Sequence, residues 1–229
     1  MWFAVGGDLR FLSHHEMMRL MERAVARAEL PVEFSRGFNP RPRVSLPLPR
    51  PVGVASRCEL MLLRLSAPMP ASELKDRLAR ELPAGLTVLR AQPLPTRPVK
   101  VIAASYEMHL DAGQAARVRQ QLAELARAEA WPVVRGQSGR GERRQGTIDL
   151  KGKVAQLSLE GQRLSFVLPA DLQRPARCLD VLVLLGLAGR TLEEPGRAAD
   201  AGEALASLVR TDVECRFDSS KDVERDMDG

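Results

Sequence analysis

An arginine-rich and proline-rich segment carries the clearest signs of chemistry in this 229-residue chain. Between Arg36 and Arg64, six arginines stand against a single acid, Glu59. Phe38 and Gly37 lie near the start of this segment, and the prolines that follow stiffen the backbone. An aromatic ring beside guanidinium groups on an extended loop can stack a base and hold the flanking phosphates. We therefore predict RNA contacts from Arg36, Phe38, Asn39, Arg41, Arg43 and Arg50.

The same residues also fit a purely structural interpretation. In it, Gly37 supplies a positive φ that other residues avoid, and Phe38 fills part of the core beneath a rigid loop. The local excess of positive charge favours the binding interpretation, and both remain open at the level of the sequence.

A second basic segment lies between Arg135 and Lys153. It is rich in glycine and lacks the residue order of a Walker or dinucleotide-binding loop. One interpretation is a loop that clamps an RNA backbone, and the other is a solvated surface loop. The interpretation as an RNA clamp adds five residues to the predicted RNA contacts: Arg140, Arg143, Arg144, Lys151 and Lys153.

His14 is the one histidine placed where catalysis is plausible. It follows Ser13 in the first turn of a predicted helix, where the helix dipole favours anions. There it can act as a general base or a phosphate ligand, with Arg41 or Arg43 stabilising the phosphate. His14 also fits the role of a hydrogen-bonded packing residue at the edge of the apolar helix face.

Several classes of protein are excluded or disfavoured. The sequence holds no Ser-His-Asp order, no HExxH motif and no paired carboxylates. Its three cysteines are too widely spaced for a metal knuckle or an iron–sulfur triad and are interpreted as buried thiols. We expect no metal and no cofactor bound by this chain. No apolar run is long enough to cross a bilayer, so we expect a cytoplasmic protein without a membrane partner.

The charge balance points to phosphate as a ligand. Of 34 basic residues, 29 are arginine, and the net charge is +5. Arginine grips phosphate oxygens with two parallel hydrogen bonds and stacks on bases. The oligomeric state is not indicated by the sequence.

The elements that would position these residues follow one order twice. In the first half we predict strands at 2–5, 32–35, 58–65 and 86–89, with helices from Ser13 to about residue 30 and over 71–82. Ser13 with Glu16 forms the capping box of the first helix. This β-α-β-β-α-β order is typical of a ferredoxin-like fold.

The second half repeats the order with an added hairpin. We predict strands at 105–110, 131–135, 147–150, 154–159, 163–168 and 209–215, and helices opening at Asp111 and over 176–187. The fold class is therefore α+β, with tandem ferredoxin-like domains at 1–91 and 101–217. A proline-rich linker at 92–100 joins them, and an acidic, disordered tail follows at 218–229.

Two blocks resemble a known family. Residues 8–14 and 35–42, separated by the amphipathic helix, closely resemble the radical-SAM-linked protein family, a domain of unknown function. The resemblance continues through residues 51–53 and 59–65, is weaker at 143–154 and 174–185, and departs at His15, where the family has an aliphatic residue. It implies a partner radical-SAM enzyme, which would carry the iron–sulfur cluster and S-adenosylmethionine.

Together these observations predict an RNA-binding accessory that presents a tRNA or rRNA segment to a radical-SAM modification enzyme, without catalytic activity of its own. Two alternatives stay open. One is a metal-independent endoribonuclease that resembles the CRISPR-repeat-processing enzymes, with His14 as its base. The other is a module that only docks on the radical-SAM partner.

Overall fold

The computed structural model describes residues 1–94, 99–136, 145–170, 173–189 and 197–217. The chain divides into two compact units. The first comprises Met1–Arg50, Cys58–Ile102 and Val213–Gly229, and the second comprises Pro51–Arg57 and Ala103–Asp212. Each unit combines helices with strands, which confirms the α+β class predicted from the sequence.

The first unit is built around three neighbouring strands. β1 (Trp2–Val5) lies between β5 (Leu86–Arg90), with which it pairs antiparallel, and β3 (Ala55–Leu60). A short 3-10 helix, η1 (Gly7–Phe11), follows β1 and leads into α1 (His14–Arg27). Two residue pairs, β2 (Val44–Ser45) and β4 (Leu62–Leu63), form a small antiparallel ladder, and α2 spans Ala71–Glu81.

The predicted start of α1 is confirmed in detail. The Ser13 side chain accepts a hydrogen bond from the Glu16 amide, and the Glu16 carboxylate accepts from the Ser13 amide at 2.8 Å. Two of the otherwise unpaired amides of the first helical turn are thereby satisfied. The carboxylate of Glu16 also accepts from the Ser13 hydroxyl, and these bonds hold the pKa of Glu16 below its usual value.

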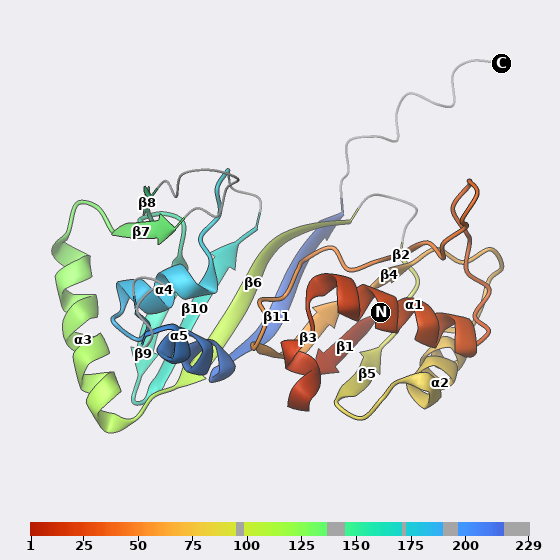
Figure 1. The fold of residues 1–229 in the computed structure, drawn as a ribbon, viewed down its shortest axis with the longest axis horizontal. Coiled ribbons are helices and arrows are strands. Elements are labelled where there is room, and N and C mark those ends of the chain that lie inside the picture. The colour runs from red at the N-terminus through yellow and green to blue at the C-terminus, as the bar shows by residue number, and fades with distance from the viewer. Residues whose placement is uncertain (95–98, 137–144, 171–172, 190–196, 218–229) are drawn as a thin grey trace, which may run out of the picture. The chain divides into compact units, whose positions relative to one another are not determined.

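One face of α1 and one face of α2 pack on the strands (Figure 1). The Arg77 guanidinium links the two helices by donating to the carbonyls of Ala28 at 3.0 Å and Glu29 at 2.7 Å. Beneath them lies an aliphatic and methionine-rich core, as expected from a sequence with few aromatic residues. Its most deeply buried members are Phe3, Met21, Ala24, Val25, Met61 and Leu78.

A glycine turn holds η1 against the start of β5. The Gly6 amide donates to the Gly85 carbonyl at 2.8 Å, and Gly85 has a φ of +96°. A Cβ at Gly85 would lie 2.9 Å from the Gly6 carbonyl oxygen and 3.3 Å from a Leu9 methyl carbon. Only glycine therefore fits this turn, for reasons of both space and conformation.

Replacing Gly85 with alanine is expected to lower the free energy of unfolding by about 1–3 kcal/mol, because a strained φ is joined by a backbone clash. Gly152→Ala is the matched control, since Gly152 also has a positive φ, +76°, but open space where its Cβ would lie. Urea denaturation of both variants measures the difference. Equal losses of stability would contradict the clash.

The second unit draws its strand residues from five neighbouring strands of a mixed sheet. These strands lie in the order β3, β11 (Leu208–Phe217), β6 (Val99–His109), β10 (Arg163–Pro169) and β9 (Ala155–Glu160). β11 runs parallel to β3, whereas β10 is antiparallel to both β6 and β9. A separate hairpin is formed by β7 (Pro132–Gly136) and β8 (Gln145–Asp149). The helices are α3 (Ala112–Arg127), α4 (Cys178–Leu184) and α5 (Arg197–Ala206).

The alternation predicted for β6 is confirmed. Tyr106, Met108 and Leu110 are buried, and the Tyr106 ring stacks on Phe166 of β10 with centroids 5.4 Å apart. Asp111 and Gln114 form the predicted capping box of α3.

Arg210, only 1% exposed, donates two hydrogen bonds to the Tyr106 hydroxyl at 3.0 and 3.2 Å. Burial raises the pKa of that hydroxyl.

Other elements differ from the expectations. Residues 32–35 form only isolated bridges, Val32 with Leu65 and Phe34 with Pro42. The strand expected at 58–65 begins at Ala55 and is interrupted at Met61 between β3 and β4. β6 begins at Val99, within the expected linker, and α5 was not predicted.

The domain boundaries expected from the sequence stay a prediction, and so does the tandem ferredoxin-like arrangement. Residues 95–98 of the expected linker and the expected tail at 218–229 lie outside the described residues. Within the part of the chain that the structure describes, no helix is both long and apolar enough to cross a membrane.

Candidate nucleic-acid interface

Residues 33–43 form a hairpin, here called the arginine hairpin. The Arg43 amide donates to the Glu33 carbonyl at 2.7 Å, and the Ser35 amide donates to the Arg41 carbonyl at 2.8 Å. The Ser35 hydroxyl accepts in turn from the Arg41 amide at 3.0 Å. Pro40 and Pro42 have no amide hydrogen to contribute to such a ladder, which explains why it stays irregular.

The tip of the arginine hairpin presents an aromatic ring to solvent. The Phe38 side chain is fully exposed, and the residues beside it, Arg36, Gly37, Asn39 and Pro40, are exposed as well. Gly37 has a φ of +143°, the conformation that its position in the turn requires. The ring does not fill the core, so the structural interpretation of Phe38 is excluded by its exposure.

The arginines between Arg36 and Arg64 fall into two groups. Four have a carboxylate within 4.0 Å: Arg43 and Arg64 share Glu33, Arg50 faces Glu59, and Arg57 faces Glu107. Arg36 and Arg41 have no carboxylate partner among the described residues. These two are the arginines that flank Phe38, so the tip combines an exposed ring with two guanidinium groups that no carboxylate of the described residues compensates.

Arg50 does not join this surface. Its side chain is 6% exposed, and its guanidinium donates to the carbonyls of Arg10 at 2.7 Å and Leu9 at 3.3 Å. Its Nε lies 4.0 Å from a carboxylate oxygen of Glu59, which is 8% exposed. The pair anchors η1 to β3, a role that a count of arginines along the sequence does not reveal.

The second basic segment is described only in part. Arg140, Arg143 and Arg144 lie outside the described residues. Lys151 is exposed and donates to the Ala128 carbonyl at 2.8 Å, and Lys153 donates to the Gln173 carbonyl at 3.3 Å. Both lysines belong to the second unit, whereas the arginine hairpin belongs to the first. Each basic segment is therefore described within its own unit.

His14 is the first residue of α1 and is half-buried. Its ring meets the ring of His15 edge-on, with centroids 6.0 Å apart. Burial, and to a lesser degree the proximity of His15, lowers the pKa of His14 below its ordinary value. Among the described residues it has no hydrogen-bonded carboxylate or carbonyl that would orient it as a general base.

The cysteines are separate thiols: Cys178 is buried, and Cys58 and Cys215 are half-buried. Burial raises the pKa of Cys178 to about 12, so this thiol is protonated and unreactive at neutral pH. No three histidine, cysteine, aspartate or glutamate side chains of the described residues are grouped so that they could hold a metal ion.

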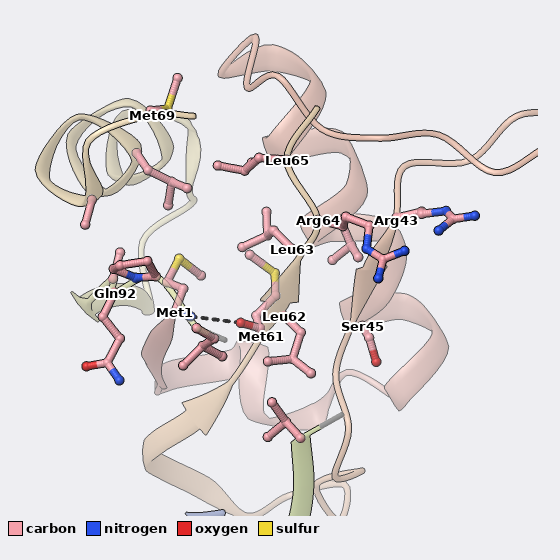
Figure 2. Close-up of a pocket in the computed structure, with 17 residues that line it drawn as sticks. Met1, Arg43, Ser45, Met61, Leu62, Leu63, Arg64, Leu65, Met69 and Gln92 are labelled. Atoms are coloured by element: carbon pink, nitrogen blue, oxygen red, sulfur yellow. Dashed lines mark hydrogen bonds between the residues drawn. The ribbon is translucent and has the colours of Figure 1, made fainter. Parts of the chain in front are cut away.

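Two features of the structure escaped the sequence analysis. One is an ion pair in the second unit between the half-buried Arg135 and the buried Asp180, which are 45 residues apart in the chain. The other is an open pocket of about 720 Å³ in the first unit, which the arginine hairpin borders at Arg43 (Figure 2). Apolar residues line most of it, and no motif in the sequence marks them as a group.

Comparison with known proteins assigns the chain to a family. The family model described as an uncharacterized protein conserved in bacteria (DUF2344) matches residues 1–179. Because the match covers well over half of the chain, the protein belongs to this family. No curated protein matches the chain. The family description names neither an activity nor a partner, so the radical-SAM link stays a prediction.

Proposed function

We propose that this protein is a cytoplasmic RNA-binding accessory that presents a tRNA or rRNA segment to a partner radical-SAM modification enzyme. One observation carries the RNA-binding part: Arg36 and Arg41, which flank the exposed Phe38, are left without a carboxylate partner among the described residues. The partner enzyme is supported by the resemblance of residues 8–14 and 35–42 to the radical-SAM-linked family.

The chemistry of the hairpin tip suits single-stranded RNA. An exposed ring offers a face on which an unpaired base can stack, and such stacking tolerates any base. Guanidinium groups on either side can hold the phosphates that flank this base. The stiffness given by Pro40 and Pro42 limits the loss of entropy when the tip becomes ordered on RNA. Asn39, also exposed, can hydrogen-bond to a base edge.

We also propose that the two units are ferredoxin-like. Support comes from the order of elements in the second unit, where β6, α3, β9, β10, α4 and β11 occur in this order, with the β7–β8 hairpin inserted after α3 and the helix α5 inserted after α4. In the first unit, the second strand of that order would be residues 32–35, whose pairing the prolines of the arginine hairpin restrict.

The test of RNA binding is fluorescence anisotropy with total tRNA at two salt concentrations. The double variant Arg36→Ala/Arg41→Ala is expected to weaken binding and to lower the slope of log K against log salt by about 1.4–1.8, or about 0.7–0.9 for each phosphate that the variant no longer neutralises. Arg19→Ala/Arg23→Ala on α1 is the matched control, since both of these arginines are exposed and the net charge changes equally. If the two double variants bind alike, the tip is not the RNA site.

A further inference from the structure

The open pocket of the first unit lies in line with β1. Met1 and Met61 exchange two backbone hydrogen bonds of 2.9 Å, an antiparallel pair beside the end of β3. Past this pair, residues 62–65 form one wall of the pocket and residues 91–94 form the other. Met69, Ala71 and Leu74 at the start of α2 also line it (Figure 2). We call this space the β4 slot.

The backbone of residues 61–65 is oriented to pair with a strand in the β4 slot. The Arg64 amide donates to the Arg43 carbonyl and the Arg64 carbonyl accepts from the Glu33 amide, so Arg64 directs its backbone groups away from the slot. These directions alternate along a strand. Leu63 and Leu65 therefore direct theirs the opposite way, on the side where Met61 already pairs with Met1.

The side chains divide the slot into two chemically different faces. Figure 2 shows Leu63 and Leu65 turned toward Met69 and Met1, and Arg64 turned the other way, toward Arg43. The two arginines share one carboxylate, because Arg43 and Arg64 lie 3.5 and 3.8 Å from the same oxygen of Glu33. One face of the slot is thus apolar, and the other carries an excess of positive charge.

We propose that the β4 slot binds one extended segment of a partner protein, in which apolar and acidic residues alternate. The segment adds a strand antiparallel to residues 62–65, a mode known as β-augmentation. Its apolar residues lie opposite Leu63 and Leu65 and pack on Met69 and Leu74. Its acidic residue lies opposite Arg64, as a cross-strand partner of opposite charge. This inference uses neither the hairpin tip nor RNA, so it stands apart from the proposed function.

A synthetic probe tests the proposal on the full chain. The probe is a seven-residue peptide of alternating valine and glutamate, acetylated and amidated, and its control is the same composition with the valines and glutamates in two blocks. We expect the alternating peptide to bind and the block peptide to bind at least tenfold more weakly. In amide hydrogen exchange, the alternating peptide should protect Leu63 and Leu65 and leave Arg64, whose amide is already bonded, unchanged.

Two variants of the chain test the contributions of the apolar face and of the charged face to peptide binding separately. Met69→Glu should weaken binding of the alternating peptide at least tenfold, because it places a carboxylate on the apolar wall. Met18→Glu, on α1 and outside the slot, is the matched control. Arg64→Glu should reverse the preference, so that a peptide of alternating valine and lysine binds more tightly than the glutamate peptide. Because only a folded chain can show this reversal, the result would exclude unfolding of the variant as the cause of the weaker binding.

Three results would overturn the proposal. The first is no binding of the alternating peptide to the unmodified chain at millimolar concentration. The second is equal binding of the alternating and block peptides. The third is protection of Leu63 and Leu65 that appears with rising protein concentration and no peptide, since a second copy of this chain would then occupy the slot.

Discussion

Substitution of Asp180 by alanine is expected to lower the free energy of unfolding by about 3–5 kcal/mol, the largest single effect on stability that we expect outside the apolar core. Asp180 is buried, and its carboxylate accepts hydrogen bonds from Arg135 at 3.1 and 2.5 Å and from the Arg177 amide at 2.6 Å. Removing it leaves a guanidinium with little exposure to water and without its counter-charge.

The loss of stability is expected to be large because the Arg135–Asp180 pair joins two elements. Arg135 is on β7, and Asp180 is in the first turn of α4, so their bond joins the hairpin to the helix. Arg135 also donates to the Pro175 carbonyl at 2.8 Å, a bond that fixes the chain leading into α4. The carboxylate at the helix start is further favoured by the helix dipole.

Urea denaturation of a double-mutant cycle measures this coupling. Asp180→Ala, Arg135→Ala and the double variant are compared, and the double variant should lose much less stability than the sum of the single losses. Glu160→Ala is the control, because it removes an exposed ion pair with Arg163 and should change stability little. Additive losses in the cycle would contradict the prediction.

Local signals predicted local structure accurately. Ser13 with Glu16 and Asp111 with Gln114 each place a cap and its partner three residues apart, and both capping boxes are present. A bond between groups so close in the chain needs no information about the rest of the fold. The prediction of alternating burial along β6 was correct for a similar reason. Successive side chains of a strand point to opposite faces of the sheet, so every second residue is buried.

Contacts distant in the sequence were not predictable in this way. Arg50 looked like a member of the basic surface because its neighbours in the chain are arginines and prolines. Its burial depends on the Leu9 and Arg10 carbonyls, which are 41 and 40 residues away. The helix α5 was missed because its buried residues, Ala201 and Ala204, are small and give a weak apolar pattern.

The candidate site likewise combines a feature that the sequence predicted with features that depend on contacts distant in the sequence. The sequence identified the arginine hairpin by composition, and it left open whether Phe38 faces the core or the solvent. The structure places that ring outside, and it also shows which arginines are already paired. Neither fact follows from residue types alone, because Glu33 compensates Arg64 from 31 positions away.

Phe38→Ala should weaken RNA binding by about 5- to 150-fold and leave stability unchanged. The range corresponds to about 1–3 kcal/mol for the stacking of one base. Because the Phe38 side chain is fully exposed, its removal takes no buried area from the fold. Anisotropy with tRNA and urea denaturation of the same samples measure both quantities. Phe11→Leu is the control for loss of an exposed phenylalanine ring outside the arginine hairpin.

Two further substitutions at the same position identify what the ring contacts. Phe38→Tyr keeps a π face and should retain most of the affinity for RNA, whereas Phe38→Leu keeps apolar area without that face and should lose it. Equal affinity of the leucine variant and the unmodified chain would contradict stacking. Such a result would mean that Phe38 is an apolar anchor, which favours a module that docks on a protein partner.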